Sequence, residues 1–181
     1  MSDDKVYHHP IEKLRDPKRL AFLETDKVVK YCLEGISPRT VLDVGTGSGI
    51  FAEAFFHLGL KVTGVDIQEP MLEAARIYVP GASFQPASSE NLPFEENAFD
   101  LVFLGLLLHE SEQPLKTLKE SARVCTLRAA VLEWPYKEEG YGPPLKHRIE
   151  PEQLKGLAVS SGFSRVRTIP LKLLSLYLLD K

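Results

Sequence analysis

The sequence predicts an α/β fold, a mainly parallel and doubly wound sheet that ends in one antiparallel hairpin. From residue 40 onward, short β-branched or apolar runs alternate with helical patterns, which is typical of βαβ units. A glycine-rich turn separates the first run from the helical pattern that follows it. Only a few residues separate the last two runs, too few for the crossover that joins parallel strands. The last pair is therefore expected to be antiparallel.

Seven strands are expected, with helices between them. The strands are predicted at 41–45, 61–66, 83–86, 99–104, 129–134, 164–169 and 173–179. The helices are predicted at 49–58, 70–78, 113–124 and 152–162. The last three of these begin beside a proline, which favours a first helical turn. Upstream, 17–23 and 24–34 predict two short helices that break near Glu24 and pack over one end of the sheet.

Length and composition favour a single domain over residues 1–181, with 1–39 as an N-terminal helical cap and 40–181 as a Rossmann-like core. Hydrophobic residues make up 44% of the chain and charged residues 26%, which is enough to form a globular core. The net charge of −3 gives no general attraction to nucleic acid or anionic lipid. We therefore expect neither as a partner.

The sequence shows no pattern typical of a membrane span, a secretory signal or a metal site. The longest apolar stretch, 101–108, has eight residues, against about twenty for a membrane span. The first 20 residues are polar and differ from a secretory signal, so we expect a cytoplasmic protein. Cys32 and Cys125 stand outside any ligand spacing, which predicts two buried free thiols, no disulfide and no metal site.

The most informative segment is VLDVGTGSGIF at 41–51. Its glycines, Gly45, Gly47 and Gly49, allow positive φ and let a ligand approach backbone N–H groups at a helix start. The segment therefore predicts a nucleoside or anion cradle, with a purely structural turn as the alternative. Ile50 replaces the third glycine of a dinucleotide fingerprint, and no Gly-Lys-Ser/Thr of a P-loop follows.

An acidic residue ends the second predicted strand. Asp66 lies 23 residues after Asp43, and an acid at this strand tip can accept hydrogen bonds from both ribose hydroxyls of a nucleoside. The alternative is an Asp that caps a helix or a turn.

Three segments together resemble the class I S-adenosylmethionine-dependent methyltransferases. They are LDVGTGSG at 42–49, VTGVDIQEPML at 62–72 and SSENLPFEENAFDLVFLGLLLHE at 88–110. The resemblance implies the strand order 3-2-1-4-5-7-6 with strand 7 antiparallel, helices on both faces, and S-adenosyl-L-methionine as cofactor. The segment CTLRAA at 125–130 departs from a Pro-Gly-Gly turn that is common in the family, and we expect a different turn there.

By position, the resemblance assigns a set of residues to the cofactor. The methionine part would lie against the glycine turn with Asp43 near its amino group, Asp66 would hold the ribose, and two residues would flank the adenine. The pair at 88–89 replaces an Asp that usually contacts the adenine amino group. The cofactor residues are Asp43, Gly45, Thr46, Gly47, Gly49, Asp66, Ile67, Met71, Ser88 and Ser89.

Catalytic candidates follow the fourth predicted strand. His109 and Glu110 stand at its carboxyl end, where ligands bind in this architecture, and either could remove a proton from a methyl acceptor. The alternative for His109 is a structural brace. Glu133, at the end of the fifth strand, is either a salt-bridged acid or a substrate contact.

The loop after the fifth strand and the N-terminal segment supply further candidates. Substrate contacts are expected from Tyr136, His147 and Arg148, with an ion pair to Glu150 or Glu152 as the alternative for Arg148. The N-terminal segment, either a lid over the site or an ordinary covering helix, carries Tyr7, His8, His9 and Arg15.

The function expected from these features is methyl transfer from S-adenosylmethionine to a small-molecule acceptor by in-line displacement. The chain has little length beyond the core with which to build an acceptor site, so the acceptor is small or a second subunit of a homodimer completes the pocket. A non-catalytic module that binds the cofactor is the first alternative, and a nicotinamide-dependent oxidoreductase is the second.

Overall fold

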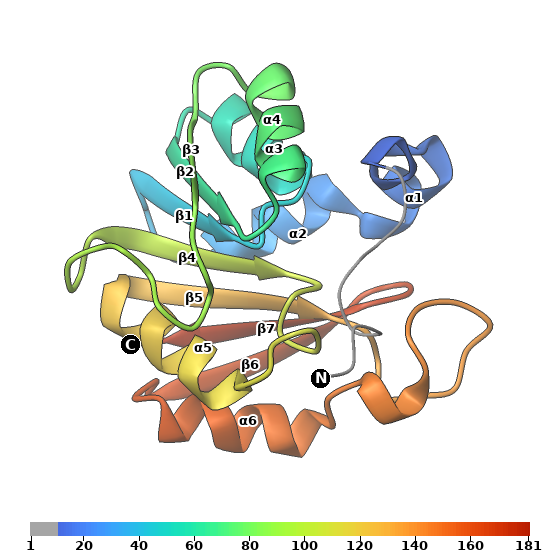
Figure 1. Cartoon of the computed structure of the whole chain (residues 1–181). Coiled ribbons are helices and arrows are strands. Elements are labelled where there is room, and N and C mark those ends of the chain that lie inside the picture. Colours follow the sequence, from blue (N-terminus) through green and yellow to red (C-terminus); the bar gives the residue numbers. More distant parts are fainter. Residues whose placement is uncertain (1–10) are drawn as a thin grey trace.

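A seven-stranded sheet with helices on both faces forms the centre of the molecule (Figure 1). The computed structural model describes residues 11–181. The strand order is β3-β2-β1-β4-β5-β7-β6, which confirms the predicted fold class and order. The strands are β1 (Thr40–Val44), β2 (Lys61–Asp66), β3 (Ser83–Pro86), β4 (Phe99–Gly105), β5 (Cys125–Glu133), β6 (Arg165–Pro170) and β7 (Ser175–Asp180).

The strand directions also match the prediction. The strands β3, β2, β1, β4 and β5 run parallel to their neighbours. The strand β7 is antiparallel to both β5 and β6 and lies between them. The carboxyl ends of the five parallel strands therefore meet at one edge of the sheet, where this architecture places its ligand site.

Helices cover both faces of the sheet. They are α1 (Pro17–Leu23), α2 (Thr25–Leu33), α3 (Ile50–His57), α4 (Glu69–Tyr78), α5 (Pro114–Val124) and α6 (Pro151–Ser160), together with the 3-10 turns η2 (Ile11–Arg15) and η3 (Leu145–His147). The helices α5 and α6 contribute Leu118 and Leu154 to the core on one face. The helices α2 and α3 contribute Val28 and Phe55 to the core on the other.

The N-terminal helices behave partly as predicted. Glu24 separates α1 from α2 and adopts the left-handed conformation, φ 47°, so the predicted break is confirmed. The helix α1 lies toward the carboxyl end of the sheet, where Phe22 contacts Trp134 just after β5. The helix α2 instead packs on a face beside α3, so the prediction that both helices cover one end was wrong for α2. The helix α2 carries three apolar side chains, Val28, Val29 and Cys32, that are buried by packing against the face of the sheet.

The junction between α5 and β5 corrects a prediction. Residues 125–130 were expected to form a turn, with the strand starting at 129, but β5 begins at Cys125, directly after α5 ends at Val124. Cys125 is buried in the core, and its pairing with Phe99 precedes a register shift before Leu101. This irregularity absorbs the change of direction that a separate turn would otherwise provide. The other predicted boundaries agree with the observed ones or differ by at most two residues.

Arg128 joins the end of α2 to the sheet. Its guanidinium donates to the backbone oxygens of Cys32 and Glu34 and forms an ion pair with Asp180 at 2.6 Å. Cys32 and Cys125 are both free and buried, as predicted, and burial raises the pKa of each thiol. Among residues 11–181, no helix is long and apolar enough to cross a membrane.

Candidate functional site

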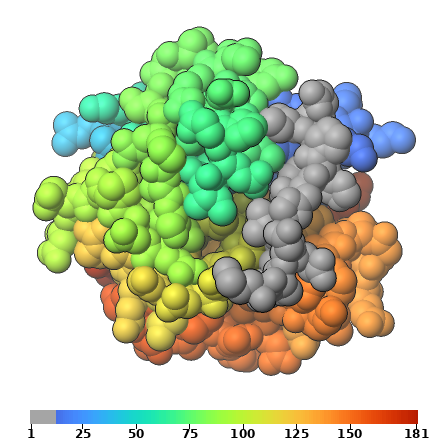
Figure 2. Space-filling view, viewed as in Figure 1, coloured from blue at the N-terminus to red at the C-terminus, as the bar shows by residue number. Residues whose placement is uncertain are grey.

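A cavity of about 920 Å³ lies at the carboxyl ends of β1, β2 and β4. Segments that are far apart in the sequence meet on this side of the molecule, among them α4 in green, the segment after β4 in yellow and the loop after β5 in orange (Figure 2). A smaller cavity of about 70 Å³ adjoins it and shares its lining at Gly45, Gly47 and Leu106. The larger cavity is lined by many of the predicted site residues, namely Gly45, Gly47, Asp66, Ile67, Met71, Ser88, Ser89, His109 and Glu110.

The glycine turn forms one wall of both cavities. Gly45 and Gly47 have φ of 68° and 53°, which most side chains adopt only with strain. A Cβ on Gly45 would lie 2.7 Å from the Leu107 side chain, so a larger residue there would displace Leu107. The N–H groups of Gly45 and Thr46 both donate to the Val65 oxygen of β2. The turn is thereby held against β2, with its backbone exposed to the cavity.

Gly49 does not line either cavity. It adopts φ 76° at the start of α3, and a Cβ there would lie 3.1 Å from the Ala75 Cβ of α4. Its observed contacts are therefore with a neighbouring helix rather than with the cavity, although the sequence grouped it with the cofactor residues.

Asp66 connects the turn to the next helix. Its two carboxylate oxygens accept from the N–H groups of Gly47 and Gln68, both at 2.9 Å. Burial raises its pKa despite these bonds. Each oxygen keeps further acceptor capacity, and the side chain lines the cavity. Asp66 therefore fits both predictions made for it. It caps the glycine turn, and it also offers an acceptor to a ligand in the cavity.

The smaller cavity gathers polar groups that are buried. The hydroxyl of Thr46 donates to Asp43 at 2.7 Å, and burial raises the pKa of Asp43 to about 7. The Ser48 hydroxyl is buried and has no hydrogen-bond partner among the described residues. Buried polar groups normally find partners. An orphaned hydroxyl beside a carboxyl is thus suited to a charged, hydrogen-bonding end of a ligand.

His109 and two glutamates form a cluster at the ends of β4 and β5. The His109 Nδ1 lies 2.8 Å from a Glu133 oxygen, and Nε2 lies 3.9 Å from a Glu110 oxygen. Glu133 also accepts from the backbone N–H groups of His109 and Trp134. A carboxylate offers only acceptors, so Nδ1 carries the proton in this pair. The lone pair of a neutral His109 is then on Nε2.

Burial and charge determine how these groups titrate. Burial lowers the pKa of His109, but the carboxylates of Glu133 and Glu110 together outweigh it and raise the pKa above its ordinary value. Burial raises the pKa of Glu110 to about 7, and Glu133 and Asp66 add to this while His109 opposes it. The cavity therefore contains an imidazole and a carboxyl whose pKa values are both raised, a pair of groups suited to general acid–base chemistry.

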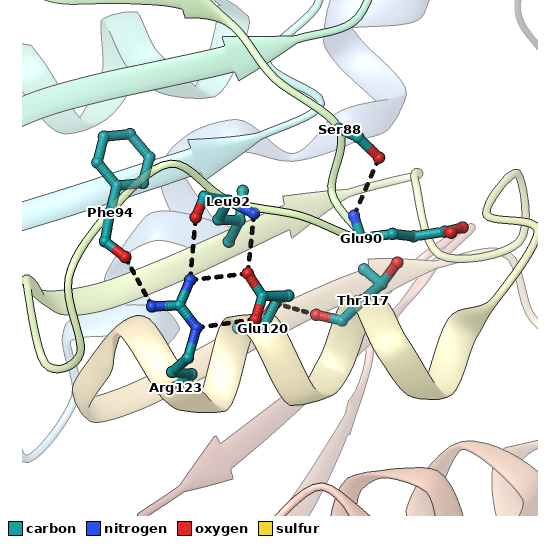
Figure 3. A network of polar contacts seen from close by, with 8 residues as sticks. Ser88, Glu90, Leu92, Phe94, Thr117, Glu120 and Arg123 are labelled. Atoms are coloured by element: carbon teal, nitrogen blue, oxygen red, sulfur yellow. Dashed lines mark hydrogen bonds and ion pairs between the residues drawn. The ribbon is translucent and has the colours of Figure 1, made fainter.

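The segment that carries Ser88 and Ser89 is fastened to α5. Arg123 donates to the backbone oxygens of Leu92 and Phe94 at 2.9 and 2.6 Å, and Glu120 accepts from the Leu92 N–H at 2.8 Å (Figure 3). The same two side chains form an ion pair at 2.7 Å. The Ser88 hydroxyl accepts from the Glu90 N–H, whereas the Ser89 hydroxyl contacts Thr117 of α5. This side of the cavity is preorganised by α5.

Replacing Arg123 with alanine is expected to lower the free energy of unfolding by about 1 to 2 kcal/mol, because two backbone oxygens and Glu120 lose a charged donor that is only partly exposed. Urea denaturation measures the change. Lys119→Ala, at an exposed position of the same helix, is the matched control and should change stability by less than about 0.5 kcal/mol. Equal stability of both variants would contradict the fastening role.

The structure does not bring the predicted substrate contacts to the cavity. Tyr136, His147 and Arg148 line neither cavity. Arg148 is buried and donates to the backbone oxygens of Pro135, Lys137, Tyr141 and Pro143. The predicted pairing of Arg148 with Glu150 or Glu152 was therefore wrong. The backbone carbonyls of the loop after β5 point toward Arg148. Its planar guanidinium has enough N–H groups to donate to all four of them.

The segment before β1 closes another side of the cavity. Arg15 donates to the Ser48 oxygen, forms an ion pair with Glu53 at 2.7 Å and lies 3.6 Å from the centre of the Tyr78 ring. These contacts fasten η2 to the start of α3 and to α4. Tyr7, His8 and His9, which were also proposed for a lid, lie outside the described residues.

Several cavity residues were not among the predicted site residues. They are Leu14, Arg19, Phe22, Glu90, Leu106, Trp134 and Tyr141. One sequence signal was available, since Arg19 and Phe22 are three residues apart and share a helix face. Leu106 has a positive φ of 57°, which no sequence pattern indicates. Strain of this kind gathers at ligand sites.

Comparison with known proteins adds family information to this geometry. The model of the methyltransferase domain family matches residues 42–130. A demethylmenaquinone methyltransferase from Chlorobaculum tepidum is 36% identical over 51% of this chain and 38% of its own length. The uncharacterized methyltransferase YcgJ from Bacillus subtilis is 30% identical over 68% of this chain and 51% of its own length. The chain thus spans about two fifths to half of these curated relatives.

A solved structure matches over nearly the whole chain. The crystal structure of a SAM-dependent methyltransferase from Aquifex aeolicus is 29% identical, covers 94% of this chain and 96% of its own, and has a TM-score of 0.82. This likeness covers more of the chain than the matched domain does.

Proposed function

The chain belongs to the class I S-adenosylmethionine-dependent methyltransferases, and from this premise we propose that it transfers a methyl group to a small-molecule acceptor. S-Adenosylmethionine is the cofactor of the family. When bound, it supplies a methyl group on a positively charged sulfur, which needs no further activation. The observation that carries the proposal is one cavity that extends from the glycine turn and Asp66 to His109 and Glu110.

The residues around the two cavities fit this cofactor. Asp66 would accept from the ribose, and Ile67 and Met71 line the cavity at the start of α4. The buried Asp43 and the orphaned Ser48 hydroxyl would receive the amino-acid end, for which the smaller cavity supplies the space. The turn at Gly45 has a positive φ of 68° and packs against the Leu107 side chain, which favours glycine there. These roles are proposals that the geometry supports.

We assign proton removal to His109. Its Nε2 atom would take the proton of the acceptor while Glu133 holds Nδ1–H and stabilises the charged ring. Alignment of donor and acceptor supplies the larger part of the rate in such displacements, roughly 7 to 11 kcal/mol. Glu110 lines the same cavity and would hydrogen-bond the acceptor.

A small acceptor is supported by the cavity and by the relatives. The volume of about 920 Å³ is near the upper end of the range for small-molecule sites, which leaves space for an acceptor beside the cofactor. The curated relatives include proteins named for demethylmenaquinone methylation and ubiquinone biosynthesis. We also propose a cytoplasmic location and no nucleic-acid partner. A homodimer that completes the pocket remains a prediction.

A methyl-label screen tests the proposal. The purified chain is incubated with S-adenosylmethionine that carries a labelled methyl group and with a metabolite extract, and labelled products are separated by mass. Label is expected in one small product, and much less label is expected with the Asp66→Ala variant at the same S-adenosylmethionine concentration. Calorimetry with S-adenosylmethionine and S-adenosylhomocysteine runs in parallel. If neither binds at millimolar concentration, the enzyme proposal fails.

A further inference from the structure

Three aromatic rings form a continuous wall at the end of the cavity that contains His109. Phe22 of α1 lies 5.7 Å from Trp134, and Trp134 lies 6.0 Å from Tyr141, measured between ring centres. All three residues line the cavity. We call Phe22, Trp134 and Tyr141 the aromatic wall.

The wall is held in place by its surroundings rather than by the rings alone. Gly142 has a φ of 77°, and a Cβ there would lie 2.7 Å from the Trp134 ring, so the loop backbone packs directly on the indole. Arg148 fastens the same loop through four backbone oxygens. The carboxylate of Glu133, which positions His109, also accepts from the Trp134 N–H. The wall and the base are therefore fixed relative to each other.

Two arginines lie close to rings of the aromatic wall. The Arg148 guanidinium lies 5.7 Å from the centre of the Trp134 ring, and that of Arg19 lies 5.9 Å from the centre of the Phe22 ring. Cations thus already interact with two of the three rings, and Arg19 lines the cavity. Of the acids at this end, Glu133 contacts His109 at 2.8 Å and burial raises the pKa of Glu110 to about 7, while Glu90 and Glu112 also line the cavity.

We infer that the aromatic wall recognises a planar aromatic acceptor that carries an ionisable hydroxyl, and that this hydroxyl is the methylated group. The inference rests on the proposed function. Rings of the ligand gain stacking or edge contacts with the wall, and Arg19 favours a phenolate over an ammonium. The hydroxyl proton passes to His109 Nε2, the oxygen forms the new bond to the methyl carbon, and the carbon–sulfur bond breaks with its electron pair returning to sulfur.

Three probes with one carbon skeleton test this inference. They are 2-naphthol, which is planar with an acidic hydroxyl, 2-naphthylmethylamine, which is planar and cationic, and decahydro-2-naphthol, which is saturated. Each is titrated calorimetrically into the full chain, with and without S-adenosylhomocysteine. Quenching of Trp134, the single tryptophan, reports whether the probe reaches the wall.

We expect 2-naphthol to bind at least tenfold more tightly than the other two probes and to quench Trp134. The variants Phe22→Leu and Tyr141→Leu should each weaken 2-naphthol at least fivefold and leave S-adenosylhomocysteine binding unchanged. Phe56→Leu, the same change at a ring on α3 outside both cavities, is the matched control and should have no effect.

Two results overturn the inference. Equal affinity for 2-naphthol and its saturated analogue would show that ring contacts do not contribute, and tighter binding of the amine would show that the acceptor is cationic. Either result leaves the methyltransferase proposal standing if S-adenosylhomocysteine binds. Failure of S-adenosylhomocysteine to bind counts against that proposal instead, and the titrations without it still decide whether the wall prefers the planar hydroxyl.

Discussion

Replacing Asp66 with alanine is expected to weaken S-adenosylmethionine binding by about 2 to 4 kcal/mol, roughly 30- to 1000-fold in Kd. Two effects contribute. The ribose loses a charged acceptor, and the Gly47 N–H loses the carboxylate oxygen that holds it at 2.9 Å. The glycine turn is then free to leave the conformation that the cofactor needs. Calorimetry with S-adenosylmethionine measures the change directly.

A second aspartate provides the matched control. Asp100, in β4, accepts from the N–H groups of Arg39 and Thr40 at 2.8 and 3.1 Å. It therefore supports as many backbone donors as Asp66 does, but near the start of β4 rather than at its carboxyl end. Asp100→Ala should lower stability and leave cofactor affinity within twofold of the original chain. Unchanged affinity in Asp66→Ala would refute the ribose assignment, and equal losses in both variants would indicate a general loss of structure.

The fold was predictable because its signals are local. The alternation of strand and helix patterns, the prolines that begin α4, α5 and α6, and the short connection before β7 are all features of neighbouring residues. The position of β7 between β5 and β6 came instead from the family resemblance. The start of β5 was misjudged because Cys125 pairs with Phe99 across the sheet, and such a pairing leaves no mark in the adjacent sequence.

The site was predictable to the extent that it is built from strand-to-helix turns. Gly45, Gly47 and Asp66 are identified by their spacing along the chain, and they line the cavity. The pairing of His109 with Glu133 joins residues 24 positions apart, and their proximity depends on β4 and β5 being neighbours. Arg148 was misread because its partners are backbone oxygens of its own loop. Every residue has a backbone oxygen, so the sequence does not indicate which of these oxygens Arg148 will bind.

Replacing His109 with glutamine is expected to lower turnover by about 10²- to 10⁴-fold, the usual contribution of a positioned general base. Cofactor affinity should stay within about threefold, because the glycine turn is held by Val65 and Asp66 and not by His109. Glu133→Gln should reduce turnover as well. A glutamine offers one acceptor oxygen in place of two, so it cannot accept from both Nδ1–H and the backbone N–H of His109 as Glu133 does, and the imidazole is held less firmly in the tautomer with a free Nε2 lone pair. Single-turnover kinetics with a labelled methyl group measure both variants.

The pH profile separates His109 from Glu110 as the base. A base acts when it has lost its proton, so kcat/KM should rise with pH through the pKa of His109, which Glu133 holds above the ordinary value, and then level off. His109→Gln should flatten this rise. Glu110→Gln removes the other group that titrates, with a pKa of about 7, and should leave the rise in place. If instead Glu110→Gln abolishes the rise and His109→Gln keeps both the rise and the rate, Glu110 is the base and His109 is a structural brace.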